Sequence, residues 1–125
     1  MSTKISTNNA PAAIGPYSQA IVAGDFLFAS GQIPINPATG NVEAADITRQ
    51  AEQSMKNVGA ILEAAGASYD KVVKTTCFLA DIADFAAFNE VYAKYFTQNP
   101  ARSCVAVKDL PKGVLCEVEV TAYLK

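Results

Sequence analysis

The chain has 125 residues, of which 50% are apolar and 18% charged, and its formal net charge is −2. This composition is typical of one globular domain and excludes a disordered chain. The acidic balance predicts no broad contact with nucleic acid, and no apolar run reaches the ~20 residues of a membrane span. The sequence contains no histidine, which excludes an imidazole base, a cysteine–histidine pair and a histidine-bound metal.

The first ten residues, MSTKISTNNA, contain no apolar stretch of the kind found in signal peptides, so we expect no secretion. The three cysteines are Cys77, Cys104 and Cys116, an odd number without a C-x-x-C pair. This pattern is typical of reduced thiols. Together these features predict a cytoplasmic protein.

Turn residues divide the chain into strands and helices. The segment QAIVAGDFLFASGQIPI predicts two strands that meet at residues 23–25, with Gly31 and Pro34 interrupting the second. Apolar residues then keep a helical period over 47–65. Asp46 is placed to cap the start of this helix, and Gly66 its end.

The second half of the chain predicts three strands and one helix. Residues 71–80 are β-branched and strand-like, whereas 84–96 predict a helix whose aromatic residues lie near one face. Further strands are expected at 103–107 and 115–124, and a short extra strand near 4–7. The order β-β-α-β-α-β-β predicts an α+β fold, with a mixed sheet and both helices on one face.

The strand at 115–124 alternates between two kinds of side chain. Its apolar residues share one face, which we expect to lie under the helices, and Glu117 and Glu119 share the other. The plainer interpretation of these glutamates is a solvated sheet face. The alternative is a carboxylate that orients water or moves a proton in a wet cleft. The two-residue period does not choose between them.

Arg102 is one of only two arginines in the chain. Its planar guanidinium either forms an ion pair with an acidic residue or clamps an anionic substrate. Cys104 follows two residues later, and a neighbouring cation lowers the pKa of a thiol. Because no histidine is present to activate it, we interpret Cys104 as a packing or pocket-lining residue rather than a nucleophile.

Four other residues are candidates for a pocket. Ser30 and Gly31 interrupt a strand, where glycine marks either the close approach of a ligand or backbone, or a bulge without function. Tyr17 follows a Gly-Pro turn and is either a pocket wall or a core aromatic. Asn89 is a polar residue in an aromatic helix, where it caps another group, faces solvent or bonds a neighbouring subunit.

Five segments taken together resemble the reactive intermediate deaminase A family, the RidA/YjgF group: APAAIGPYSQA, ASGQIP, FNEVYAKYF, PARSCVAV and LPKGVLCEVEV. The resemblance runs in order over essentially the whole chain, which we treat as a single RidA-like domain at 1–125. Its most specific part is PARSCV, followed by an LP turn and EVEV. The segment FTQNPAR is shorter than in some members, which bears on the cleft edge and on substrate size.

The resemblance implies a chorismate-mutase-like fold that assembles as a homotrimer. The helix-free sheet faces then form a central barrel, with clefts between neighbouring subunits. The implied reaction is hydrolysis of 2-iminopropanoate, 2-iminobutanoate and their enamine tautomers, such as 2-aminoacrylate, to 2-keto acids and ammonia. No metal or cofactor is implied for this chain, and pyridoxal-phosphate dehydratases acting on serine or threonine would supply the substrate.

By the same resemblance, Arg102 pairs with the substrate carboxylate and Glu117 holds the attacking water. The surrounding cleft residues are Tyr17, Ser30, Gly31, Asn89 and Cys104. Two other classes of function stay open. One is a non-catalytic protein that binds small carboxylates and regulates a partner. The other is a ribonuclease or translation inhibitor, against which the net charge and the missing histidine argue.

Overall fold

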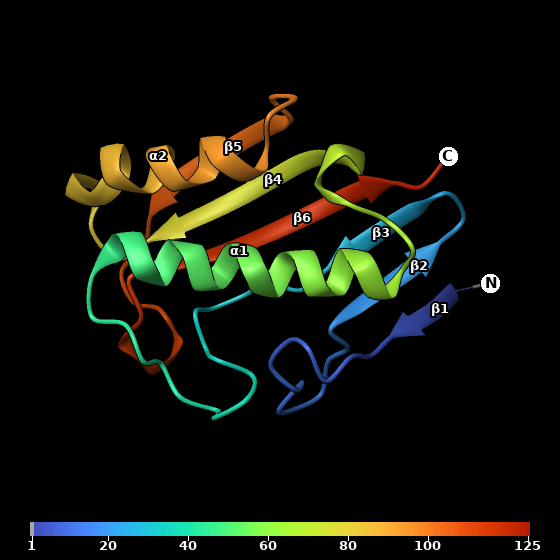
Figure 1. The fold of residues 1–125 in the computed structure, drawn as a ribbon, viewed down its shortest axis with the longest axis horizontal. Coiled ribbons are helices and arrows are strands. Elements are labelled where there is room, and N and C mark those ends of the chain that lie inside the picture. The colour runs from blue at the N-terminus through green and yellow to red at the C-terminus, as the bar shows by residue number, and fades with distance from the viewer. Residues whose placement is uncertain (1) are drawn as a thin grey trace.

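A computed structural model describes residues 2–125 of the chain (Figure 1). Within these residues there are two α-helices, α1 (Ile47–Ala64) and α2 (Phe85–Tyr95). The strands are β1 (Ser2–Ile5), β2 (Ala20–Ala23), β3 (Phe26–Ala29), β4 (Val72–Leu79), β5 (Ala101–Ala106) and β6 (Cys116–Tyr123).

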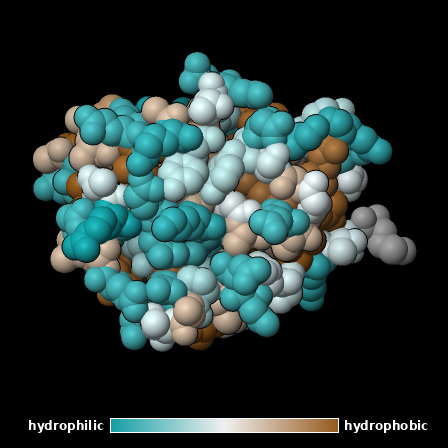
Figure 2. Space-filling view, viewed as in Figure 1, coloured by the Kyte–Doolittle hydropathy of each residue, from teal (hydrophilic) through white to brown (hydrophobic). Residues whose placement is uncertain are grey.

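The strands form one sheet in the order β1-β2-β3-β6-β4-β5. Neighbouring strands are antiparallel except β4 and β5, which are parallel because α2 carries the chain back between them. Both helices cover the same face of the sheet (Figure 1), and their outer surface is mainly hydrophilic (Figure 2). The predicted α+β fold, with a mixed sheet and helices on one face, is confirmed.

Two predicted strand positions differ from the structure. The short extra strand expected near 4–7 is β1, which begins and ends two residues earlier and pairs with β2. The prediction for the fifth strand was wrong at its start, because β5 begins at Ala101 rather than at residue 103. Parallel pairing with β4 extends the strand backwards and places Arg102 opposite Thr75. Arg102 is therefore held within the sheet.

The predicted alternation of β6 is confirmed and defines the core. Its apolar residues are at most 1% exposed and belong to the same buried cluster as the inner faces of both helices: Cys116, Val118, Val120 and Ala122. Burying an aliphatic side chain of this kind stabilises the fold by roughly 1.5–3 kcal/mol. The other set, which includes Glu117 and Glu119, faces away from the helices. The core thus fixes which face of the sheet carries the glutamates.

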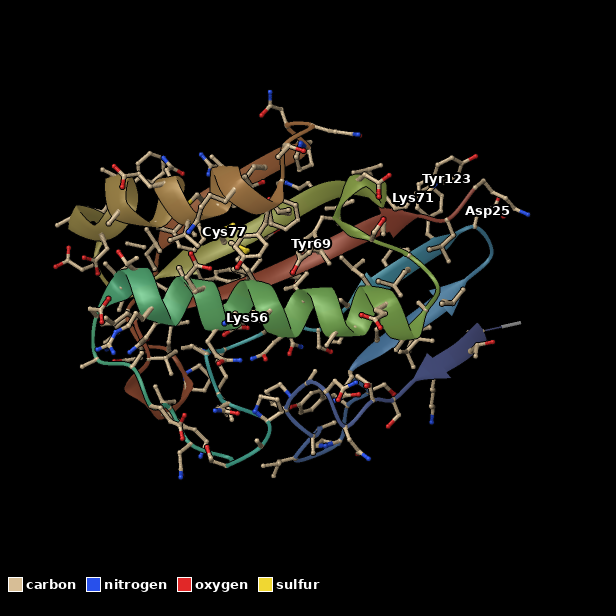
Figure 3. All side chains as sticks on the ribbon, in the orientation of Figure 1. Asp25, Lys56, Tyr69, Lys71, Cys77 and Tyr123 are labelled. Atoms are coloured by element: carbon tan, nitrogen blue, oxygen red, sulfur yellow. The ribbon has the colours of Figure 1, made fainter. Side chains whose placement is uncertain are left out.

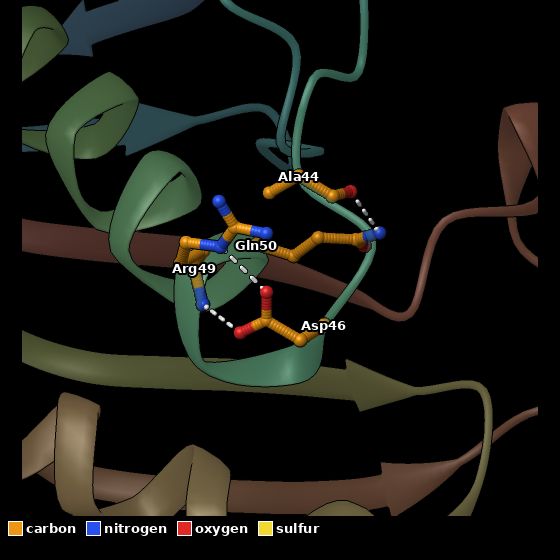
Figure 4. Close-up of polar contacts among 4 residues, drawn as sticks. All are labelled: Ala44, Asp46, Arg49 and Gln50. Atoms are coloured by element: carbon orange, nitrogen blue, oxygen red, sulfur yellow. Dashed lines mark hydrogen bonds and ion pairs between the residues drawn. The ribbon is translucent and has the colours of Figure 1, made fainter.

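The start of α1 is fastened by its own side chains (Figure 4). The carboxylate of Asp46 accepts hydrogen bonds from the backbone N–H of Arg49 at 3.0 Å and from Arg49 Nε at 2.6 Å. Buried Gln50 donates to Ala44 O at 2.9 Å and accepts from the backbone N–H of Leu115 at 2.8 Å. Asp46 is therefore the predicted N-cap, and Gln50 ties the helix to the loop before β6.

A glycine inside α1 accommodates a tyrosine. Tyr69 lies beside the helix (Figure 3) and donates its hydroxyl to Met55 O at 2.6 Å. A Cβ at Gly59 would overlap the Tyr69 hydroxyl and press on its ring. Glycine in a helix interior costs roughly 0.5–1 kcal/mol relative to alanine. The glycine makes room for a partly buried hydrogen bond between the helix and the segment that leads into β4.

We predict that Gly59→Ala destabilises the protein, although the same change stabilises most helices. Relief of the glycine cost gains up to about 1 kcal/mol, whereas overpacking against Tyr69 costs about 1–3 kcal/mol. The melting temperature in calorimetry should therefore fall. The double variant Gly59→Ala/Tyr69→Phe, which lacks the overlapping hydroxyl, should lose less than the two single effects added together. A higher melting temperature for Gly59→Ala alone would contradict the packing described here.

Candidate functional site

The helix-free face of the sheet carries a glutamate held against a glycine. The backbone N–H of Gln32 donates to Val118 O at 2.7 Å, and the N–H of Val118 donates to Gln32 O at 3.1 Å. This bridge lays the segment after β3 alongside β6. A Cβ at Gly31 would overlap the Glu117 carboxyl. Gly31 thus leaves the space that the Glu117 carboxyl occupies, whereas the sequence had indicated a ligand, backbone or a bulge at this position.

Ser30 and Tyr17 complete the surroundings of Glu117. The Ser30 hydroxyl donates to Ser18 O at 2.6 Å, which fixes this segment to the loop that carries Tyr17. Tyr17 is 53% exposed and is therefore a pocket wall rather than a core aromatic. Both residues line a cavity of about 620 Å³ together with Gly31, Glu117 and Glu119. We call this cavity the glutamate pocket.

The environment of Glu117 favours its protonated form. Burial raises the pKa of its carboxyl, and the negative charge of Glu119 raises it further. Within residues 2–125 no side chain forms an ion pair with Glu117. A carboxylate whose pKa is raised is a stronger base than an ordinary glutamate, and it therefore accepts a proton from water more readily. Glu119, for which the sequence indicated no role, contributes to this pocket by its charge.

Arg102 lies in a second hollow, at the edge of the sheet beside α2. Its Nη1 donates to Asn89 Oδ1 at 2.6 Å. Its guanidinium carbon lies 4.7 Å from the centre of the Tyr92 ring and 5.5 Å from that of Phe85. A cavity of about 290 Å³ adjoins it, lined by Asn89, Tyr92, Ala93, Phe96, Asn99, Pro100 and Arg102. We call this cavity the arginine pocket.

Arg102 is half-buried without an acidic partner. Its ion-pair interpretation fails, because no carboxylate among residues 2–125 lies within ion-pair distance of the guanidinium. An amide oxygen and two aromatic faces surround it instead. A guanidinium has five N–H donors, and the side chain of Asn89 engages one nitrogen. The remaining donors suit a planar anion such as a carboxylate.

Cys104 lies on β5 opposite Cys77 of β4. Burial raises the pKa of the Cys104 thiol, and Arg102 lowers it by a smaller amount. Cys77, which Figure 3 shows on β4, is fully buried, and desolvation raises the pKa of its thiol to about 12. Protonated thiols are poor nucleophiles. The structure therefore supports the packing interpretation of Cys104.

The two pockets lie on opposite faces of the sheet. Arg102 is in register with Thr75, which is buried under the helices, whereas Glu117 is in register with Phe78 on the helix-free face. Strand β4 also lies between β5 and β6. One chain therefore brings Tyr17, Ser30, Gly31 and Glu117 together, and separately Asn89 and Arg102. It does not bring Arg102 to Glu117. Their strands, β5 and β6, follow one another along the chain but are not adjacent in the sheet.

That aromatic rings of α2 surround the Arg102 guanidinium was not predicted from the sequence. Phe85, Asn89 and Tyr92 follow one another at spacings of four and three residues, so they share one face of α2. That spacing was the available signal. The position of Arg102 within β5 was needed to see which residue this face meets.

Two structural features are absent from residues 2–125. Neither helix is sufficiently long and apolar for a membrane crossing. No three or more cysteine or acidic side chains of this part of the chain gather as ligands for a metal ion.

Comparison with known proteins places the chain in a family. The sequence model described as Endoribonuclease L-PSP matches residues 7–124. A RutC family protein of Pyrococcus horikoshii is 56% identical, and the 2-iminobutanoate/2-iminopropanoate deaminase of Escherichia coli is 52% identical, each over 98% of both chains. The crystal structure of Escherichia coli TdcF with bound serine is 46% identical, with a TM-score of 0.94 over 98% of this chain and 99% of that one. The chain therefore belongs to the Endoribonuclease L-PSP family, the RidA/YjgF group that its motifs predicted.

Proposed function

We propose that this protein hydrolyses reactive 2-imino acids, such as 2-iminopropanoate and 2-iminobutanoate, to 2-keto acids and ammonia. The observation that carries the proposal is Arg102, a half-buried cation that no carboxylate of residues 2–125 neutralises. A substrate carboxylate would satisfy it. The names of relatives support the same chemistry, since one is a 2-iminobutanoate/2-iminopropanoate deaminase and TdcF holds serine, an amino acid with such a carboxylate.

We place the reaction between two copies of the chain. Arg102 and Glu117 lie on opposite faces of one sheet, so a substrate that meets both requires the arginine pocket of one subunit and the glutamate pocket of another. The helix-free face also exposes large apolar side chains, Phe26, Phe28, Val105 and Tyr123, each at least 40% exposed. Such a surface favours association. A homotrimer with clefts between subunits, as the family resemblance implies, satisfies both conditions.

In this arrangement Arg102 binds the carboxylate and so fixes the neighbouring imine carbon. The substrate reacts as its protonated imine, and an enamine reaches this form by taking a proton from solvent at its β-carbon. Glu117 accepts a proton from water while the water oxygen attacks the imine carbon, which gives a neutral carbinolamine, and Glu117 then returns this proton to the nitrogen. The C–N bond breaks as the hydroxyl oxygen forms the carbonyl and gives its own proton to Glu117, so that ammonia and the 2-keto acid leave and Glu117 passes the proton to ammonia or solvent. A carboxyl with a raised pKa suits both directions of this proton transfer.

The main rival is a non-catalytic protein that uses the same arginine to bind small carboxylates. It predicts that imine hydrolysis stays at its spontaneous rate whatever happens to Arg102. Ribonuclease activity, which the family description names, would need a basic surface, whereas this chain has a net charge of −2.

We predict that Arg102→Ala lowers kcat/KM for imine hydrolysis by about 100-fold or more, because truncating one member of a buried charge pair costs several kcal/mol. The assay couples threonine dehydratase to detection of 2-oxobutanoate, with semicarbazide present to compete for the free imine. Arg49→Ala is the matched control, since Arg49 is the other arginine and its side chain is 70% exposed on α1. Full activity of Arg102→Ala would refute the assignment, and no acceleration by the wild type would favour the binding rival.

We also predict the pH dependence of the reaction. Glu117 acts as a base only when ionised, and its pKa is raised, so kcat/KM should increase with pH through a midpoint above the ordinary glutamate value of 4.5. Burial and the charge of Glu119 both raise the pKa of Glu117, and the charge is the smaller cause. Glu119→Gln removes that charge and should move the midpoint to lower pH. The midpoint should stay above the ordinary glutamate pKa because burial persists. Glu117→Gln should abolish the acid limb together with most of kcat.

The control for this experiment is Glu63→Gln, which removes an exposed charge on α1. The acid limb should not move in that variant. If the midpoint is the same in Glu119→Gln as in the wild type, Glu117 is not the group that titrates.

A further inference from the structure

We propose that Tyr92 and Thr75 are positioning residues for Arg102: the Tyr92 ring fixes the guanidinium in the orientation that receives a carboxylate, and Thr75 fixes the ring. The inference rests on the proposed function, because it concerns the residue that we assign to the substrate. It extends the site to two residues with no role in the mechanism described above.

The Tyr92 ring lies against the guanidinium of Arg102. The guanidinium carbon of Arg102 lies 4.7 Å from the centre of the Tyr92 ring, within the ~6 Å over which a ring face attracts a cation. A carboxylate in the same place would also hold the arginine, but it would neutralise the charge and occupy N–H donors. The ring face attracts the cation and uses no donor. The arginine is therefore held while most of its donors stay available to a ligand.

The Tyr92 ring is itself held in place by its neighbours. Tyr92 is 8% exposed. The centre of its ring lies 4.7 Å from the ring centre of Phe96 and 6.1 Å from that of Phe88. Its hydroxyl lies 2.7 Å from Thr75 Oγ1, and Thr75 is fully buried. Packing and the hydrogen bond together restrict both the tilt of the ring and its depth beneath the guanidinium.

Thr75 connects the Tyr92 ring to the strand that pairs with Arg102. Thr75 is the residue of β4 that pairs with Arg102 of β5. One position on β4 therefore lies beside the backbone of the arginine and also bonds the ring under its side chain. Asn89, one turn earlier on α2, completes the arrangement through its bond to Nη1. The backbone of Arg102 is therefore held by β4, and its side chain is held by α2.

Folding stability alone does not account for the hydrogen bond between the hydroxyls of Thr75 and Tyr92. Removing both partners of a buried hydrogen bond and keeping their shape is close to neutral for folding. A valine and a phenylalanine at these two positions would fill the same space. The hydroxyl pair adds orientation, because a hydrogen bond has a preferred direction and apolar packing has none.

The test measures substrate KM and kcat, and the Kd for 2-oxobutanoate by titration calorimetry, on the full-length oligomer. Tyr92→Leu removes the ring face and should raise both KM and Kd by about 3- to 30-fold. The change in kcat should be smaller, because the ring stabilises the arginine equally in the bound substrate and in the transition state. A purely structural role would lower the folded fraction and hence kcat, and would leave KM and Kd unchanged.

Tyr92→Phe and Thr75→Val keep the ring and test the hydrogen bond, so the proposal stays testable even where Tyr92→Leu does not fold. Each should raise Kd by about 2- to 5-fold, since the ring stays beneath the guanidinium but loses the bond that fixes its orientation. The double variant should raise it no further than either single one. Tyr95→Phe is the matched control, because Tyr95 on the same helix bonds Glu52 rather than a group near Arg102, and its Kd should equal that of the wild type.

Unchanged Kd and KM in Tyr92→Leu, or unchanged Kd in both Tyr92→Phe and Thr75→Val, would overturn the inference. Failure of the proposed function has a different result, in which the wild type binds 2-oxobutanoate but does not accelerate imine hydrolysis. In that case the effects on Kd still decide whether Tyr92 and Thr75 position Arg102. Absence of 2-oxobutanoate binding by the wild type would overturn both proposals.

Discussion

Successive side chains of a β-strand point to opposite faces of the sheet, and this alternation separates the two charged groups on which the proposed chemistry depends. The buried residues of β6 fix Glu117 on the helix-free face. Pairing of β5 with β4 fixes Arg102 on the face that α2 covers. No adjustment of side chains within one subunit brings these groups together. Association of subunits is therefore a chemical requirement of the proposed function as well as a means of covering apolar surface.

The site leaves both charged groups without a full partner. Burial and Glu119 raise the pKa of the Glu117 carboxyl, and Arg102 has an amide and aromatic rings in place of a counter-charge. Partly burying a charged group without a counter-charge costs folding free energy, which the apolar core must offset. A ligand that carries a carboxylate and exchanges protons would compensate both. The same features that weaken the free protein thus favour binding.

Much of this organisation could be predicted from the sequence. The two-residue period of β6 placed Glu117 and Glu119 on one face, and the helical period of 47–65 gave α1 within one residue. Contacts between distant segments could not be predicted in this way. At Gly31 the sequence left open a close approach or a bulge without function, and it did not indicate Glu117 as the neighbour. The start of β5 was misplaced because pairing with β4, rather than local propensity, determines it.

The most direct measurement is complementation between two inactive variants. Arg102→Ala keeps Glu117, and Glu117→Gln keeps Arg102, so only a site that combines two subunits can have both groups in a mixed oligomer. After dissociation and joint refolding at equal amounts, we predict recovery of up to about a quarter of the wild-type imine hydrolase activity, as random pairing of subunits across a symmetric interface requires. Each variant refolded alone should stay inactive. Mixed oligomers with no activity would contradict a site shared between subunits.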